Sequence, residues 1–320
     1  MRPARPTSRP STGPALRRTS RIAAAFALIA AYSISPRPDP IGPAILGQRP
    51  AYAPSAIGDV PNSMAIDRLI WVPGLDAGWD PQGLAFAEGK LFVSAYQSHG
   101  AWQFRGPCRV FRIDPETGRD TGHIDVPQPC GHAGGLAYSD GKLFVADTRS
   151  LFEFDLDRAF SAAKANYRVF PLGRGLKGAF AASANGAIWI GGYEENRPAK
   201  IFKFDLATIQ SLRDGATLTS DLASAVVSIS TYGQGAAIDR TGKLWISRSD
   251  IGWGFLDPFD AAGGRSEQRY AMPAGIEGIA FDEHSALWGV SEAGARHLPL
   301  RYPFFPLIFR LDPRRLVPAD

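Results

Sequence analysis

Residues that could carry acid–base or metal chemistry recur in this chain beside glycine. Glu277, Gln82 and Gln234 each stand directly before a glycine and a short apolar run. His132 lies within Cys130–Gly135, where three glycines permit a ligand to approach the backbone closely. Carboxylate and amide oxygens bind hard cations, whereas carboxylates and histidine exchange protons during hydrolysis. These positions are therefore the first candidates for a functional site.

Three chemistries fit these residues, and the sequence leaves the choice open. Glu277 and Asp147 could bind a divalent cation of the calcium type, with neighbouring glutamines supplying amide oxygens. His132 could act as a general base beside Asp147. Two carboxylates, such as Glu277 and Glu292, could instead cleave a glycosidic bond. A structural role for His132 is the competing interpretation.

The charge distribution and the missing motifs exclude several classes of protein. Residues 1–53 carry eight arginines and one acid, so residues 54–320 hold 27 basic and 30 acidic side chains despite a formal net charge of +4 for the whole chain. We therefore expect no nucleic-acid partner. The chain also has no Gly-x-Ser-x-Gly element, no Cys-x-x-Cys pair and no phosphate-binding glycine loop.

The first 53 residues have the outline of an export signal followed by a proline-rich tether. An arginine-rich start precedes Ile22–Ile34, an apolar run too short for a comfortable membrane span. We expect a periplasmic or secreted protein with no stable membrane span after cleavage and with its folded domain over residues 54–320. An uncleaved anchor is the alternative, and the cleavage site, the export route and the oligomeric state stay open.

The two cysteines, Cys108 and Cys130, are expected to form a disulfide in an exported chain. The bond would close a loop of 21 residues. In the chain-entropy model such a closure stabilises the fold by roughly 3 kcal/mol.

The candidate residues must be positioned by a repeated unit, because a turn-and-strand signature occurs five times. It begins at Gly89, Gly141, Gly186, Gly242 and Ser285, at intervals of 52, 45, 56 and 43 residues. A strand of small residues precedes each signature, and one or two further strands follow it. Four antiparallel strands repeated at this interval predict an all-β fold, a single β-propeller.

Five four-stranded blades are predicted, and the last blade lacks its fourth strand at the end of the chain. Arg68–Val72 reads as an isolated strand that could supply it and close the ring. A sixth blade remains an alternative, and it would have to lie within Thr208–Ala225.

One face of the propeller is expected to carry function. Turns between the first and second strands are short, whereas the loops that begin each blade and those after each second strand are long and rich in polar side chains. Besides His132, Asp147 and Glu277, the predicted substrate-binding residues on this face are Gln82, Gln234, Tyr96, Trp102, Lys177, Arg248 and Glu292. Trp79 and Trp253 map to the same face and could either bind a ligand or pack under loops.

Two groups of residues are expected to be structural. Trp189, Trp245 and Trp288 occupy the same place in the repeat, which predicts that they pack between blades. An aspartate ends the third strand of most blades and is expected to cap the following turn; these are Asp114, Asp155, Asp205 and Asp312.

The units QGLAFAEGKLFVSAY, GGLAYSDGKLFVAD and EGIAFDEHSALWGVSE resemble the SMP-30/gluconolactonase and NHL-repeat propellers over about residues 80–312. The resemblance implies a divalent cation in the channel, held by a glutamate, two asparagine-type ligands and an aspartate, that activates water for lactone or ester hydrolysis. Glu277 matches the family's Glu-Gly element. The asparagine ligands have no counterpart, because Gln82, Gly134, Gly178 and Gln234 stand at the corresponding places.

The sequence thus predicts an exported propeller that binds a small molecule or carbohydrate at its channel mouth. Lactone or ester hydrolysis is the first activity to consider. A non-catalytic propeller that binds a ligand or protein, and a glycoside hydrolase with paired carboxylates, are the alternatives.

Overall fold

The computed structural model describes residues 43–101, 103–161, 165–250, 252–259, 264, 268–296 and 303–319. All the described residues belong to one compact unit, the second of two into which the chain divides, which spans Gly42–Asp320. The predicted signal therefore lies almost wholly outside the described residues. Within them, no helix is long and apolar enough to cross a membrane.

The second unit is a five-bladed β-propeller, as predicted. The first four blades are consecutive antiparallel sheets. They comprise β3 (Trp79–Ala87), β4 (Lys90–Gln97), β5 (Cys108–Ile113) and β6 (Asp120–Val126); β7 (Gly135–Ser139), β8 (Lys142–Asp147), β9 (Ser150–Asp155) and β10 (Tyr167–Pro171); β11 (Phe180–Ala184), β12 (Ala187–Gly191), β13 (Ala199–Asp205) and β14 (Ala225–Ile229); and β15 (Gly233–Ile238), β16 (Leu244–Asp250), β17 (Trp253–Phe259) and β18 (Tyr270–Met272).

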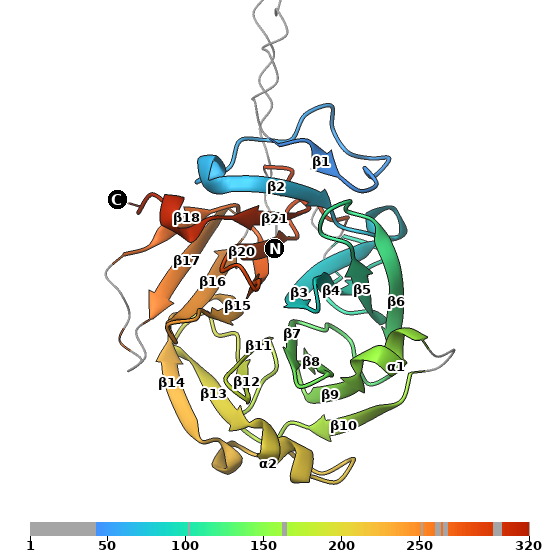
Figure 1. Ribbon diagram of the computed structural model, residues 1–320, viewed down its shortest axis with the longest axis vertical. Helices are drawn as coiled ribbons and strands as arrows, with labels where there is room; N and C mark the ends of the chain where they lie inside the picture. The colour runs from blue at the N-terminus through green and yellow to red at the C-terminus, as the bar shows by residue number, and fades with distance from the viewer. Residues whose placement is uncertain are drawn as a thin grey trace, which may run out of the picture. The chain divides into compact units, whose positions relative to one another are not determined.

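The fifth blade joins the two ends of the domain. It contains β19 (Ile276–Phe281), β20 (Leu287–Ser291) and β21 (Leu307–Leu311), and β2 (Ile66–Trp71) pairs antiparallel with β21. Figure 1 shows β2 beside β21, which confirms the predicted closure by an N-terminal strand. A short strand, β1 (Ile45–Leu46), adds to β2 in parallel. Residues 43–53, which were predicted to be tether, are thus in contact with the propeller.

The segment considered for a sixth blade forms helices instead. α2 (Leu206–Ser211) and a 3₁₀ turn (Ser220–Leu222) lie between β13 and β14. The other short helices are α1 (Leu156–Ser161) and 3₁₀ turns at Ser63–Ala65, Leu75–Ala77 and Pro313–Arg315. The domain therefore has five blades.

The first strands of the blades form the inner ring, and glycine lets them approach. In order round the ring, each of β3, β7, β11, β15 and β19 contacts the next, and β19 contacts β3 (Figure 1). A Cβ on Gly135 would lie 2.2 Å from the backbone nitrogen of Ala181, and a Cβ on Gly278 would lie 2.2 Å from that of Leu84. Since a side chain would collide with the neighbouring backbone, these positions require glycine.

Apolar side chains fill the spaces between neighbouring blades. Trp245 packs into the cluster shared with the fifth blade, Trp288 into the cluster between the fifth and first blades, and Trp189 against the cluster between the third and fourth. The prediction that these tryptophans pack between blades is confirmed. Trp79 is also buried in the core, in edge-to-face contact with Phe111.

The aspartates that end the third strands mostly cap turns, as predicted. Asp114, Asp155 and Asp312 each accept a hydrogen bond from a following backbone N–H. Asp205 is the exception: it precedes α2 but its side chain accepts no hydrogen bond from the helix, and it instead accepts one from the Ser224 hydroxyl. The capping prediction was therefore wrong for Asp205.

Candidate functional site

A pocket of about 530 Å³ opens on the predicted functional face, and every blade contributes to its wall. The residues that line it are Gln82, Tyr96, Phe104, Arg105, His132, Thr148, Lys177, Ala179, Tyr193, Glu195, Gln234, Asp250, Glu277 and Glu292. Seven of these, namely Gln82, Tyr96, His132, Lys177, Gln234, Glu277 and Glu292, are residues for which the sequence predicted a catalytic or substrate-binding role, and the loops that carry Thr148, Tyr193, Glu195 and Asp250 were expected on this face.

Irregular pairing places three of the polar side chains. β3, β15 and β19 each have a register shift with their neighbour strand, and the shifts lie between Pro81 and Leu84, between Gly233 and Gly235, and between Ile276 and Ile279. These intervals contain Gln82, Gln234 and Glu277. A bulge in a strand redirects a side chain, and bulges occur often beside active sites. The recurring glutamine- or glutamate-glycine pair therefore marks a bulge at the pocket.

The most deeply placed acids in the pocket are Glu277 and Glu292. Only 3% of Glu277 and 6% of Glu292 is exposed to solvent. The Gln82 side-chain amide, itself buried, donates a hydrogen bond to Glu292 Oε2 at 3.0 Å. The inner part of the pocket therefore combines two carboxylates with an ordered amide.

His132 forms part of the pocket wall and is held on two sides. Its ring stacks on that of Tyr96, with the centroids 4.9 Å apart and an angle of 21° between the planes. Its Nδ1 lies 2.9 Å from the carbonyl oxygen of Phe104. Because a carbonyl oxygen only accepts, Nδ1 carries the proton and Nε2 carries the lone pair. Burial lowers the pKa of His132, so the neutral imidazole is favoured at pH 7.

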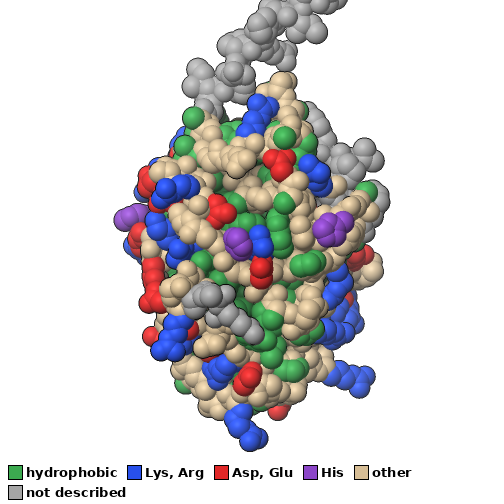
Figure 2. Space-filling view, turned by 90° about the vertical axis from the view of Figure 1, so that its right-hand side faces the viewer, with side chains coloured by type: hydrophobic (Ala, Val, Ile, Leu, Met, Phe, Trp, Pro, Cys, Tyr) green, Lys and Arg blue, Asp and Glu red, His purple; other side chains and the backbone are tan. Residues whose placement is uncertain are grey.

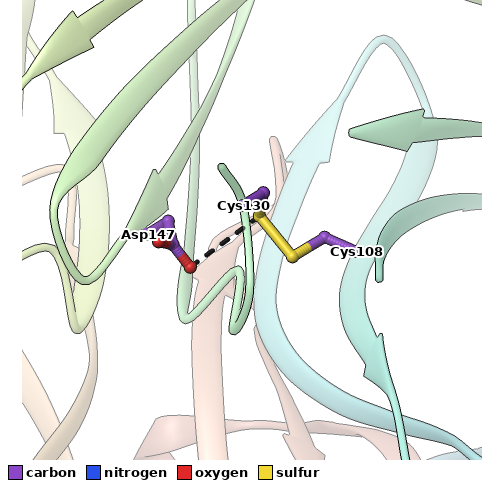
Figure 3. A group of neighbouring side chains, drawn as sticks. All are labelled: Cys108, Cys130 and Asp147. Atoms are coloured by element: carbon purple, nitrogen blue, oxygen red, sulfur yellow. Dashed lines mark hydrogen bonds between the residues drawn. A yellow bond between two sulfur atoms is a disulfide. The ribbon is translucent and has the colours of Figure 1, made fainter. Parts of the chain in front are cut away.

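Asp147 lies behind His132 and is absent from the pocket lining. Only 1% of the residue is exposed, and its Oδ1 accepts hydrogen bonds from the backbone N–H groups of Gly131, His132 and Ala133, at 3.1, 2.7 and 3.1 Å. Figure 3 shows its carboxylate next to the disulfide between Cys108 and Cys130. That disulfide, predicted from the sequence, has a Cα–Cα distance of 6.0 Å.

The residues present do not fit the metal site implied by the SMP-30 resemblance. Asp147 Oδ1 accepts hydrogen bonds from three amides, and no asparagine is among the described residues that line the pocket. Over the described ranges, the group of three acid, histidine or cysteine ligand atoms within 4.8 Å of one another is Cys108, Cys130 and Asp147. Both sulfurs of that group are used in the disulfide, so neither is a thiolate ligand.

Charged side chains at the outer part of the pocket form ion pairs. Lys177 Nζ lies 2.9 Å from Glu194 Oε1, and Arg197 contacts the same carboxylate at 3.2 Å. Tyr193 donates a hydrogen bond to Glu195 at 3.3 Å. Burial and the nearby Glu195 and Asp250 carboxylates raise the pKa of Tyr193, so the hydroxyl remains a hydrogen-bond donor. On the face shown in Figure 2, acidic and basic side chains are likewise interspersed.

Of the other predicted site residues, Arg248 lies outside the pocket lining, and so does Trp253. The Arg248 guanidinium donates to the Thr231 carbonyl oxygen at 2.6 Å and to Asp257 Oδ2 at 3.0 Å, and Arg248 does not line the pocket. Trp253 packs edge-on against Tyr232, with the Arg248 guanidinium 5.6 Å from its ring centre. Trp102 lies outside the described residues.

Sequence reasoning did not identify Phe104 and Arg105 as lining residues. They belong to the loop between β4 and β5, from which only Trp102 was proposed as a ligand contact. Phe104 is 48% exposed. The aromatic side chains of this glycine-flanked loop could have predicted a ligand contact at Phe104 as well, but the prediction was made for Trp102 alone.

Comparison with known proteins shows no family for this chain. No family model matches the chain, and no curated protein matches it. The chain is similar to the solved structure of glutaminyl cyclase from Myxococcus xanthus, with a TM-score of 0.49 and 12% identity over 76% of this chain and 93% of that one. It is also similar to PQQ-bound aldose sugar dehydrogenase from Streptomyces coelicolor, with a TM-score of 0.44 and 15% identity over 73% and 94%.

A third similar structure is the Dos1 propeller, with a TM-score of 0.38 and 14% identity over 66% of this chain and 52% of that one. By their names, the first two of these neighbours are enzymes. At such identities the likeness concerns the fold alone, because one fold serves many unrelated functions.

Proposed function

We propose that the pocket binds a small hydroxylated molecule of the carbohydrate class and hydrolyses an ester or lactone bond in it. The observation that carries the proposal is the convergence, in one pocket built by all five blades, of His132 with the buried carboxylates of Glu277 and Glu292. A rigid scaffold that holds an acid–base group beside buried polar groups is typical of an active site.

The aromatic part of the wall suits a sugar ring. Tyr96, Phe104 and Tyr193 line the pocket together with the imidazole of His132. Aromatic rings pack on the apolar C–H face of a sugar, while its hydroxyl groups need hydrogen-bond partners. The amide of Gln234 and the carboxylates of Glu277 and Glu292 lie in the same pocket and can serve as those partners.

His132 has the protonation state that ester hydrolysis requires. As water attacks the acyl carbon, Nε2 of His132 accepts the proton that water loses. When the bond between the acyl carbon and the leaving oxygen breaks, the imidazolium returns that proton to the leaving oxygen. The products are a carboxylic acid and an alcohol, or a single hydroxy acid from a lactone. The Gln234 amide is available to donate a hydrogen bond to the carbonyl oxygen during attack.

The test is a panel of sugar lactones, sugar esters and aryl glycosides assayed with the native protein and with His132→Gln. We expect turnover of a lactone or ester to fall about 10²- to 10³-fold in the variant while affinity changes only a few-fold. His99→Gln is the matched control, because His99 is an exposed histidine that does not line this pocket.

Two other outcomes would replace the proposal. Binding without turnover of any panel member would make the protein a ligand-binding propeller. Turnover of a glycoside that depends on Glu277 and Glu292 but not on His132 would establish the paired-carboxylate mechanism instead.

A further inference from the structure

The turn that carries His132 has an unusual backbone. Three successive amides, those of Gly131, His132 and Ala133, point at one oxygen, Oδ1 of Asp147. Ala133 has a φ of 51°, in the left-handed region that non-glycine residues seldom adopt. Successive N–H groups that converge in this way form an anion-binding concavity, or nest. Here the anion is supplied by a side chain of the same chain.

Further contacts join this nest to the rest of the site. Gly131 and its carbonyl oxygen are fixed by the β4–β5 loop, since Gly106 N–H donates to Gly131 O at 2.9 Å. The Ser94 hydroxyl donates to Ala133 O at 2.6 Å. Cys130, which precedes the nest, is tied by the disulfide to Cys108 at the start of β5. The same loop supplies the Phe104 carbonyl that orients the imidazole.

We propose that Asp147 is the positioning residue for His132: its buried carboxylate fills the nest and thereby fixes the turn that presents the imidazole to the pocket. Asp147 need not contact the substrate for this role. The inference rests on the proposed function only in giving His132 a catalytic task, and the geometry of the nest can be tested without a substrate.

Asp147 can act on His132 through its charge or by holding the turn, and loss of each would change the pKa of His132 in opposite directions. Burial, the largest influence, lowers it; the Phe104 carbonyl and the Glu292 and Asp147 carboxylates raise it, and Arg105 lowers it. Tyr96 is a further titratable group that packs against the ring. Loss of the Asp147 charge alone would therefore lower the pKa further, whereas loss of the turn would expose the imidazole and raise the pKa towards its ordinary value.

The experiment is an NMR titration of the His132 ring proton in Asp147→Asn and Asp147→Ala, with His132→Gln to assign the resonance. We expect Asp147→Asn, which keeps an acceptor oxygen in the nest, to hold the pKa of His132 at or below the native value. We expect Asp147→Ala to raise it. If Asp147→Ala leaves the pKa unchanged or lowers it as Asp147→Asn does, Asp147 acts only through its charge or not at all, and the positioning role is wrong.

Two additional variants keep the test decisive. Asp147→Glu retains the charge but displaces it by a methylene, so it should raise the pKa of His132 even if Asp147→Ala fails to fold; a native pKa in Asp147→Glu would overturn the proposal. Asp282→Ala breaks a comparable turn on the opposite face and controls for general destabilisation, since it should leave the titration of His132 unchanged.

With a substrate in hand, kcat should fall at least 10-fold more in Asp147→Ala than in Asp147→Asn, with KM changed only a few-fold. Failure to find any substrate would count against the proposed function, whereas the NMR result would still decide the role of Asp147.

Discussion

Asp147 on the pocket side and Asp282 on the opposite face make the same kind of structure for different purposes. Asp147 gathers three amides around one oxygen. Asp282 accepts the N–H groups of His284 and Ala286 through Oδ1 and the indole N–H of Trp288 through Oδ2. In the first case the ordered turn carries a pocket histidine, and in the second it fixes a core tryptophan. The two aspartates therefore differ in which side chain their ordered turn positions.

Asp239 repeats the arrangement of Asp282 one blade earlier. It accepts hydrogen bonds from the N–H groups of Thr241 and Lys243 and from the indole of Trp245. In both blades the aspartate precedes the tryptophan by six residues. The opposite face therefore uses these two acids to build the repeat, whereas on the pocket face Asp147 orders a turn, Gly131–Ala133, that does not repeat. Four predictions test this division.

The largest effect on stability is expected on the pocket face, from loss of the disulfide. The double substitution Cys108→Ala and Cys130→Ala should destabilise the domain by about 3 kcal/mol, because the unfolded chain gains the freedom of the opened loop. Chemical denaturation of the two proteins measures the difference. We also expect ligand affinity to fall, since the nest and the Phe104 carbonyl both depend on this link. Unchanged affinity at full destabilisation would show that the disulfide supports only the fold.

Asp282→Ala should destabilise the domain by about 2 kcal/mol but leave ligand affinity unchanged. It leaves the buried indole N–H of Trp288 and two turn amides without their acceptor, and such a loss typically costs 1–3 kcal/mol. Denaturant midpoints give the stability, and titration with a pocket ligand gives the affinity, which should match that of the native protein. A large loss of affinity would mean that the two faces are not independent.

Asp239→Asn should cost less, about 1 kcal/mol, because Asp239 is less buried than Asp282. Burial opposes the shift, but hydrogen bonds from Thr241 and Trp245 lower the pKa of Asp239. Because its pKa is lower in the folded state, the ionised carboxylate stabilises the fold at pH values above the unfolded pKa of about 3.9. This stabilisation is lost as the pH falls through the lower pKa of the folded state. Melting curves from pH 5 to pH 3 should therefore converge for native and variant proteins. A constant difference in melting temperature would contradict the prediction.

The smallest effect concerns the pH dependence that His132 confers. Its pKa is lower in the folded protein than its ordinary value, so the unfolded chain binds a proton that the folded one does not, and stability falls as the pH drops below about 6.5. His132→Gln should flatten the stability profile from pH 7 down to pH 5. Thermal melting across this interval, with His99→Gln as control, measures the slope. Equal slopes in native protein and His132→Gln would show that burial of His132 does not contribute.

The blades could be predicted from the sequence because the residues of each repeat determine its own turns and strands. The glycine, or in the last blade the serine, that begins each repeat signature marks a tight turn, and the small residues before it permit the inner strands to pack closely. The orphan strand Arg68–Val72 could be paired with the last blade because an incomplete sheet leaves an open edge. These inferences need only neighbouring residues and the requirement that a ring close.

The site was predictable in part, and the misses have a common cause. Gln82, Gln234 and Glu277 could be placed because their strands repeat, and each stands before a glycine at the bulge that turns it into the pocket. Asp147 ends β8 and Arg248 lies two residues before the end of β16, at the equivalent place in the repeat, yet the pocket lining includes neither. The amides that bind Asp147 come from a turn that does not repeat, Gly131–Ala133. Arg248 is held away from the pocket by Thr231 and Asp257, and no periodicity predicted these contacts.

Because β2 pairs with β21, the ring can close only after nearly the whole chain has been synthesised. Asp67 on β2 and Arg310 on β21 pair across the fifth blade although they are 243 positions apart. The ribosome releases β2 before any blade and its partner only after the other four blades have been made. During that interval the exposed edge of β2 is open to wrong partners. A chain that stops short of β21 leaves β2 without its partner and cannot close the ring, so the last residues synthesised decide whether the first strand is protected.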